Sequence, residues 1–349
     1  MSYFMRNGNT YRISRKDSLD ITEHLPGGNY TVNKDEMSGQ LFLEKIDGFN
    51  VPNKIYGDCL RHTDRIVKTF LDRPNATGVM LTGEKGAGKT LLTKNVCKEL
   101  AELDIPTLVI NAPWVGDKFN SFIQSIEQPC AILFDEFEKV YDRDDQEKIL
   151  TLLDGVFPSK KLFLLTSNDK WRVDFHMRNR PGRIYYMLDF KGVDASFIRE
   201  YCQDNLNAKE HIERIVNIST LFTEFNFDML KALVEEMNRY GENPQQALAL
   251  LNAKPEFGQT DIKYKVKIVH NGREVDYKDD FRGNPLNPNG VEIGFDEDPS
   301  DNSSDYIHRI FTANTLMTVK NGEFVFEDNG TRVVLTRIVE RQANYWDAF

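Results

Sequence analysis

The sequence lacks long apolar runs and has few cysteines. No stretch reaches the roughly 18 consecutive apolar residues that would predict a transmembrane helix. The N-terminus, MSYFMRNGNTYRISRK, has no apolar core of the kind found in secretion signals. The four cysteines form no CxxC pair and lie far apart, at Cys59, Cys97, Cys130 and Cys202. We therefore expect a cytoplasmic protein with reduced thiols and no membrane partner, and neither a disulfide framework nor a zinc site.

Positive charge is also scarce. The 349 residues include 44 lysines and arginines against 54 aspartates and glutamates, so the net charge is −10. Proteins that bind duplex DNA are usually basic, which makes nucleic acid the less favoured partner, although a local basic pore stays open. The six histidines show no metal-ligand spacing, and the acidic stretch at 296–305 lacks the EF-hand pattern.

The pattern of apolar residues divides the chain into four parts. Residues 1–50 and 257–349 look β-rich, residues 191–256 read as helices, and residues 51–190 alternate between strands and helices. Such alternation predicts an α/β domain with a parallel sheet covered by helices on both faces. The expected strands are Val79–Thr82, Thr107–Asn111, Ala131–Phe134, Leu162–Thr166 and Ile184–Phe190. Residues 283–304, rich in Asn, Pro, Asp and Ser, predict a long loop.

A glycine-rich motif follows the first of these strands and opens the next helix. It reads GxxxxGKT, and in this context it predicts a loop whose backbone N–H groups surround phosphates at the positive end of a helix dipole. Lys89 would reach the β- and γ-phosphates of ATP, and Thr90 would hold Mg²⁺. The flanking strand and helix disfavour the alternative, a chance glycine-rich turn. The predicted ATP-binding residues of the motif are Gly83, Glu84, Lys85, Gly86, Ala87, Gly88, Lys89 and Thr90.

Two acids end a later strand. The apolar stretch Ala131–Phe134 is followed by Asp135 and Glu136, so we expect both acids at the carboxyl edge of the sheet, where ligands bind in open α/β folds. Asp135 would bind Mg²⁺ through water, and Glu136 would polarise the attacking water. Many strands end in acids, so this signal gains its weight from the phosphate loop that precedes it.

Two further polar signals follow. Asn168 comes just after the strand Leu162–Thr166, where it would orient the attacking water or sense the γ-phosphate; the alternative is a turn cap. Arg178, Arg180 and Arg183 gather just before the last strand, and such a cluster needs an anion. Their own site lies behind them, so the predicted partner is the γ-phosphate on a neighbouring subunit. The alternative is a solvated basic turn.

The order of phosphate loop, acid-ended strand, asparagine and RPGR resembles the AAA+ superfamily, in its clade with a second region of homology. The resemblance runs over residues 50–255 and implies a five-stranded parallel sheet, a helical lid, ATP and Mg²⁺, and a homo-hexameric ring. By position, Arg180 and Arg183 match the paired arginine fingers, and Tyr56 and Gly57 match the contact with adenine. The clade's Gly-Ala-Asp is reduced to its Asp at Asn226–Asp228, and the lid has no sensor-2 arginine. The whole chain also resembles ATPases of large tailed bacteriophages, which would place it in the cytoplasm of an infected bacterium.

The triplet Trp114, Val115 and Gly116 follows the second strand, where katanin and spastin carry a pore loop that grips extended polypeptide. The alternative is that Trp114 packs against the subunit rim or the N-terminal part. The resemblance thus implies an ATPase that remodels, threads or disassembles a protein substrate through a central pore. The competing interpretations are a nucleic-acid motor or loader, and a Bcs-type translocator of folded cargo, a class that lacks the aromatic triplet.

Overall fold

The computed structural model describes residues 2–7, 10–15, 22–153, 160–169, 171–174, 176–177, 181–190, 192–220, 222, 225–252, 263–286, 289–297, 306–320 and 323–338. By internal contacts the chain divides into two compact units, Met1–Lys191 and Gly192–Phe349. Each unit has a hydrophobic core of its own.

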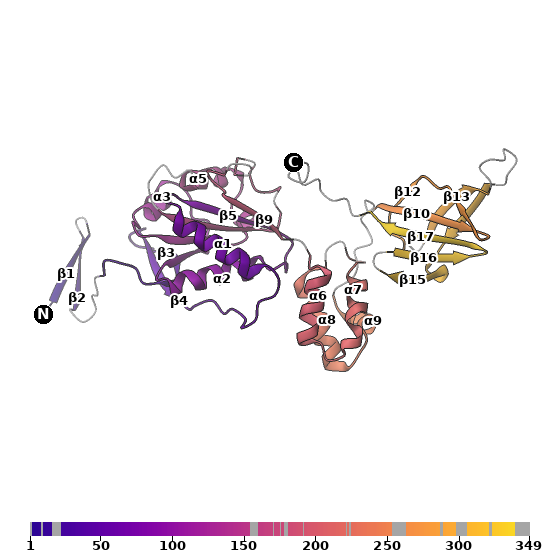
Figure 1. The fold of residues 1–349 in the computed structure, drawn as a ribbon. Helices are drawn as coiled ribbons and strands as arrows, with labels where there is room; N and C mark the ends of the chain where they lie inside the picture. Colours follow the sequence, from indigo (N-terminus) through magenta and orange to yellow (C-terminus); the bar gives the residue numbers. More distant parts are fainter. Residues whose placement is uncertain are drawn as a thin grey trace. The chain divides into compact units, whose positions relative to one another are not determined.

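The first unit is built on a seven-stranded sheet (Figure 1). Six of its strands run parallel, and one edge strand is antiparallel to its neighbour. In spatial order the strands are β4 (Leu41–Ile46), β3 (Gly28–Lys34), β6 (Pro106–Ile110), β7 (Cys130–Phe134), β8 (Lys161–Ser167), β5 (Thr77–Gly83) and β9 (Tyr186–Phe190). The predicted parallel α/β sheet is therefore confirmed, with each of the five expected strands in it.

The sheet extends beyond those five strands, because β3 and β4 come from the segment that the sequence assigned to a separate N-terminal part. β3 pairs in parallel with β6, and β4 closes the edge as the second strand of a hairpin. Tyr30 and Val32 of β3 are buried in the same core as Leu108 of β6. The boundary at residue 50 was therefore wrong for this segment. Within the described N-terminal residues, only β1 (Ser2–Asn7) and β2 (Thr10–Arg15) form a separate hairpin.

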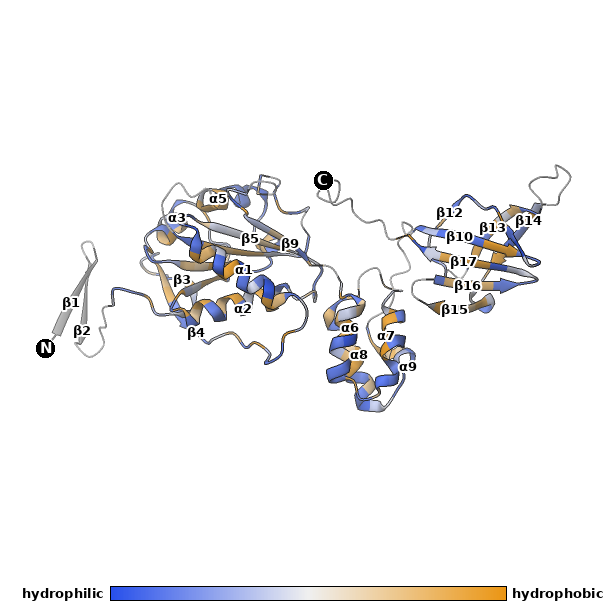
Figure 2. Cartoon of the chain, in the orientation of Figure 1, coloured by the Kyte–Doolittle hydropathy of each residue, from blue (hydrophilic) through white to orange (hydrophobic). Residues whose placement is uncertain are grey.

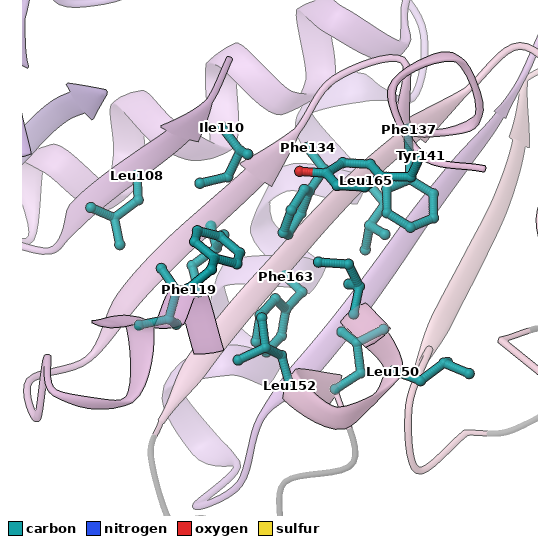
Figure 3. Close-up of a cluster of buried hydrophobic side chains, with 14 of the residues drawn as sticks. Leu108, Ile110, Phe119, Phe134, Phe137, Tyr141, Leu150, Leu152, Phe163 and Leu165 are labelled. Carbon is teal, nitrogen blue, oxygen red and sulfur yellow. The ribbon is translucent and has the colours of Figure 1, made fainter. Parts of the chain in front are cut away.

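Helices cover both faces of this sheet. On one face, α1 (Cys59–Asp72) and α2 (Lys89–Glu102) pack on alternate residues of β5, β7 and β8. On the other face, α3 (Asp117–Gln124) and α5 (Arg143–Leu153) pack on the intervening residues, together with the short α4 (Phe137–Val140) (Figure 3). Both faces of each central strand are therefore buried, which explains their continuous apolar runs.

The second unit begins with four helices, as residues 191–256 predicted. They are α6 (Ala195–Asn205), α7 (Ile212–Ser219), α8 (Phe227–Tyr240) and α9 (Pro244–Leu250), with a 3-10 turn at Lys209–His211. Figure 2 shows hydrophobic and hydrophilic residues interspersed along α6 and α8, as expected for amphipathic helices. Asn226 accepts a hydrogen bond from the backbone N–H of Met229, at 2.9 Å, and thus caps α8.

A β-rich part follows within the same unit. Its six-stranded sheet contains β11, β10, β17, β16 and β15 in that order, with β12 paired to β10, while β13 and β14 form a second sheet over the same core. Their bounds are β10 (Lys263–His270), β11 (Arg273–Val275), β12 (Asp280–Arg282), β13 (Val291–Asp296), β14 (Tyr306–Phe311), β15 (Leu316–Lys320), β16 (Glu323–Asp328) and β17 (Thr331–Arg337), with a 3-10 turn at Ala313–Thr315. The prediction of a long loop at 283–304 is wrong for the residues of β13, because Val291, Ile293 and Phe295, at alternate positions of this strand, are buried in the core.

Candidate functional site

The glycine-rich motif forms the turn between β5 and α2. Gly83, Gly86 and Gly88 have φ values of 133°, 81° and 100°, in the region that glycine enters without steric cost. Gly83 also has no room for a side chain, since a Cβ there would lie 2.0 Å from the carbonyl oxygen of Phe190 on β9. The local sequence therefore fixes a tight loop at the carboxyl edge of the sheet and points the N-terminus of α2 at it.

Lys89 closes this loop from inside. Its side chain is buried, and Nζ donates to the carbonyl oxygens of Gly83 and Glu84, the second at 2.8 Å. Nζ also donates to Oδ1 of Asn168, at 3.1 Å. The cation therefore sits in the loop at the N-terminus of α2, where the helix dipole adds to its attraction for a phosphate.

The acid pair lies directly across the sheet edge from Lys89. Asp135 is exposed at the end of β7, and Glu136 is partly buried with a left-handed backbone, φ 49° and ψ 46°. Thr166 of the neighbouring strand β8 contacts both acids. Its Oγ1 lies 2.6 Å from Oδ1 of Asp135 and accepts a hydrogen bond from the backbone N–H of Glu136, at 2.8 Å. Thr166 was not predicted as a site residue, because it reads as the last residue of an ordinary apolar strand.

Asn168 joins the phosphate loop to the acid strand. Besides accepting from Lys89, its Nδ2 donates to Oε1 of Glu136 at 3.3 Å and to Oε1 of Glu138 at 3.2 Å. Glu138 also accepts from the backbone N–H of Asn168, at 3.0 Å. The side chain of Asn168 thus contacts both motifs, an arrangement compatible with the predicted sensor role. Glu138 was also missed by the sequence analysis, although it follows the acid pair by only two positions.

Glu136 is held by a lysine that the sequence did not single out. Lys139 Nζ lies 2.7 Å from Oε1 of Glu136, and the two side chains are about half exposed. This hydrogen bond lowers the pKa of Glu136 below its ordinary value, and the hydrogen bond from Asn168 acts in the same direction. Glu136 is therefore ionised near neutral pH and can accept a hydrogen bond from water.

The predicted magnesium ligands are compatible with that ion. Thr90 and Asp135 both present oxygen atoms, which Mg²⁺ prefers, and both residues are exposed at the sheet edge. Among the described residues, no group of three or more His, Cys, Asp or Glu side chains could hold a metal by itself. A site of this kind suits Mg²⁺, which keeps several waters and takes its other ligands from substrate phosphates.

The predicted adenine contact lies at the same end of the domain. α1 ends at Asp72 and β5 begins at Thr77, so α1 must run back along the sheet, antiparallel to β5. Tyr56 and Gly57 precede α1 and are therefore carried toward the end where β5 becomes the phosphate loop. Tyr56 is partly buried, with Lys54 Nζ 4.9 Å from its ring centre, and Gly57 has φ 67°.

Arg183 lies at the opposite end of β5. A Cβ on Gly78 would lie 2.1 Å from the carbonyl oxygen of Arg183, so the two backbones touch there. Since a strand rises by about 3.3 Å per residue, Gly78 and Gly83 are separated by about 16 Å, more than an arginine side chain spans. Arg183 Nη1 donates to the carbonyl oxygen of His176, at 3.1 Å. Arg178 and Arg180 lie outside the described residues.

Trp114 does not project from the domain. Its indole N–H donates to the carbonyl oxygen of Val32, at 3.2 Å, and its ring packs on the core (Figure 3 shows part of this core). The parallel β3–β6 register ends at Thr31 and Val109, so Val32 lies just beyond the pairing with β6. Tyr141 also holds the loop, since its hydroxyl donates to the carbonyl oxygen of Ala112 at 3.2 Å.

The pore-loop role of Trp114, Val115 and Gly116 stays a prediction; in the single chain the indole contacts β3 of the N-terminal segment, the partner that the alternative named. Val115 packs against the same core as Trp114, and Gly116, with φ 84°, precedes α3. β3 was not expected in the sheet, although the N-terminal part was named as an alternative partner of the indole.

Comparisons with known proteins agree with this geometry. Residues 79–190 match the family described as "ATPase family associated with various cellular activities (AAA)". The chain is 25% identical over 213 residues to the peroxisomal ATPase PEX1 of Homo sapiens. The aligned region covers 55% of this chain and 16% of that protein. The chain is also 27% identical over 203 residues to the nuclear valosin-containing protein-like of Mus musculus, covering 51% of this chain and 23% of that protein. The chain thus spans less than a quarter of each of these two relatives.

The matched region coincides with the site. It begins in β5, ends with β9, and contains the phosphate loop, the acid pair, Asn168 and Arg183. No helix among the described residues is both long and apolar enough to cross a membrane. The chain therefore contains an ATPase domain, in which residues 79–190 match the AAA family.

Proposed function

We propose that this chain hydrolyses ATP and that Lys89, Asn168 and Glu136 act together in the reaction. The observation that carries the proposal is the connection of the phosphate loop to the acid strand through one amide, with Lys89 on its Oδ1 and Glu136 on its Nδ2. A γ-phosphate bound at the loop would face both side chains. An incoming water between them would then be oriented by Asn168 and Glu136 for attack in line with the leaving oxygen.

Each residue has a separate part in this proposal. Lys89 exchanges its contacts with the loop carbonyls for phosphate oxygens, which compensate its charge better. Glu136, ionised because of its lowered pKa, accepts the hydrogen bond of the attacking water and takes up its proton. Mg²⁺, held by Thr90 and by Asp135 through water, would neutralise charge on the β- and γ-phosphates.

The test is the variant Glu136→Gln. It should bind ATP with nearly the affinity of the unchanged protein, because Lys89, Thr90 and Asp135 remain. Its hydrolysis should fall by about a hundredfold or more, since the amide cannot accept the proton. Binding measured by calorimetry and phosphate release measured at saturating ATP separate these effects. Normal turnover in this variant would remove Glu136 from the mechanism.

In this proposal the site is completed at the interface between two copies of the chain, called the seam below. The position of Arg183 about 16 Å from its own phosphate loop along β5 supports action on the γ-phosphate of a neighbouring chain. Arg180 would act beside it as the second finger. A head-to-tail ring gives every copy such a neighbour, and we propose a homo-hexamer on the strength of the family resemblance.

We propose a protein as the substrate of this machine. The net charge of −10 disfavours a nucleic-acid partner, and the β-rich part at 263–338 offers a surface beyond the ATPase domain. Threading through a central pore stays part of this proposal, and the contact of Trp114 with β3 is the observation that favours the non-threading alternative. A Glu136→Gln trap that holds ATP should retain the substrate in a pull-down, and recovered nucleic acid in place of protein would refute this choice. The bacteriophage origin stays a prediction.

A further inference from the structure

Thr166 holds both acids of the candidate site at once. Its hydroxyl donates one hydrogen bond and accepts another, and the chemistry of the two partner groups decides which is which. The backbone N–H of Glu136 can only donate, so Oγ1 accepts from it at 2.8 Å. Oγ1 then donates its proton to Oδ1 of Asp135, 2.6 Å away. One side chain on β8 therefore joins the side chain of Asp135 and the backbone of Glu136, the two residues that follow β7.

The backbone of Glu136 needs this support. A residue with a side chain is uncommon at φ 49° and ψ 46°, and such conformations persist only where surrounding contacts hold them. The hydrogen bond to Thr166 is a contact of this kind, because it fixes the N–H direction at the residue that turns. The direction in which the Glu136 side chain leaves the strand follows from that turn.

The hydroxyl of Thr166 is itself shielded from water. Thr166 is 1% exposed and lies between the buried strands β7 and β5. Removing its oxygen would leave the N–H of Glu136 without an acceptor and free the Asp135 carboxylate to rotate. Asp135 and Glu136 would then change position, while Lys89 and the glycine loop stay in place.

We propose that Thr166 is a positioning residue for ATP hydrolysis, which orients Asp135 toward magnesium and Glu136 toward the attacking water. The inference rests on the proposed function. Thr166 itself touches no reacting atom and acts only through the two acids. Residues that orient metal ligands in this way typically change metal affinity or activity by about 10- to 100-fold when they are removed.

Two variants and a matched control separate this role from simple packing. Thr166→Val keeps the shape of the side chain and removes the hydroxyl, whereas Thr166→Ser keeps the hydroxyl and removes the methyl. Thr77 supplies the control: it is fully buried in the adjacent strand β5, and its Oγ1 has no hydrogen-bond partner among the described residues. Thr77→Val is therefore the same chemical change without the contacts to the acids.

The experiment uses the full chain and three measurements. The first is the affinity for a non-hydrolysable ATP analogue, in EDTA and in saturating Mg²⁺. The second is the rate of phosphate release as Mg²⁺ is titrated, and the third is the melting temperature. In Thr166→Val we expect unchanged affinity in EDTA, a loss of about tenfold in the affinity gained from Mg²⁺, and hydrolysis lower by about 10- to 100-fold. Thr166→Ser and Thr77→Val should each stay within about threefold of the unchanged protein.

Each outcome decides the matter. If Thr166→Val hydrolyses ATP and responds to Mg²⁺ like Thr77→Val, the positioning role is wrong. If it melts early and loses affinity equally in EDTA and in Mg²⁺, or if Thr166→Ser fails in the same way, Thr166 is a packing residue and the inference is overturned. Absence of hydrolysis in the unchanged protein would instead refute the proposed function, and the analogue measurements would still report on the contact with Asp135.

Discussion

Replacing Trp114 should destabilise the first unit, because the indole is part of its core. Trp114→Phe removes the hydrogen bond to the carbonyl oxygen of Val32, a loss of about 1 kcal/mol. Trp114→Ala also removes the ring. Deleting a fully buried Trp costs about 3–5 kcal/mol, so this partly buried one should cost about 2 kcal/mol. For a unit of this size, each kcal/mol lowers the melting temperature by about 2–4 °C.

The assay is thermal unfolding of the full chain with Trp171 as the control position. We expect Trp114→Phe to melt about 2–4 °C lower and Trp114→Ala about 4–8 °C lower than the unchanged protein. Trp171 is 68% exposed in the same unit, so Trp171→Ala should change the free energy of unfolding by less than about 0.5 kcal/mol. An unchanged melting temperature for Trp114→Ala would refute the packing argument and return the indole to the role of a free, projecting side chain.

Three further outcomes are expected. Lys89→Ala should show no nucleotide binding by calorimetry, because the phosphates lose their main cation; unchanged affinity would remove the phosphate loop from the site. Arg183→Ala should bind ATP normally but hydrolyse it about 10³-fold more slowly, and mixing it with Glu136→Gln should restore part of the activity, since one kind of seam then has both groups. Co-assembly without recovery would show that Arg183 does not act on a neighbour. Lys139→Met should raise the pKa of Glu136 toward its ordinary value, so the acid limb of the hydrolysis profile moves to higher pH. Lys148→Met breaks a similarly spaced pair, with Asp145 at 2.7 Å, and should leave that limb in place; equal shifts in both variants would contradict the assignment.

The site residues that could be predicted are those whose role follows from their close neighbours in the sequence. The glycines of the phosphate loop lie within a few positions of one another, and their spacing alone predicts the tight turn. The two acids directly follow an apolar strand, and ligands bind at the edge of the sheet where such strands end. The packing rules of a parallel sheet then bring the two motifs together. Asn168 could be placed between them on the same argument, and the structure shows its amide in contact with both.

The residues that were missed depend on partners far away along the chain. Thr166 reads as an ordinary β-branched strand residue until its contact with Asp135 is known. β3 falls in the segment 1–50 that was assigned to a separate β-rich part, because no local pattern indicates its parallel pairing with β6. The contact of the Trp114 indole could not be predicted for the same reason, since its acceptor lies on β3, in a segment that was assigned to a separate part of the chain. Strand pairing over long separations is thus the information that local patterns lack.

The pairing of β3 with β6 also bears on how the chain tolerates trimming. A truncated chain that begins at residue 51 would lack β3 and β4. The strand β6 would then have a row of unpaired N–H and C=O groups along one side. Leu108 and Ile110 would lose the strand that shields them, and the indole of Trp114 would lose its acceptor. A bare, apolar edge of this kind is a template for pairing with other chains and for aggregation. The N-terminal hairpin of β3 and β4, which ends the sheet with the charged residues Glu44 and Lys45, thus also serves as its protective edge.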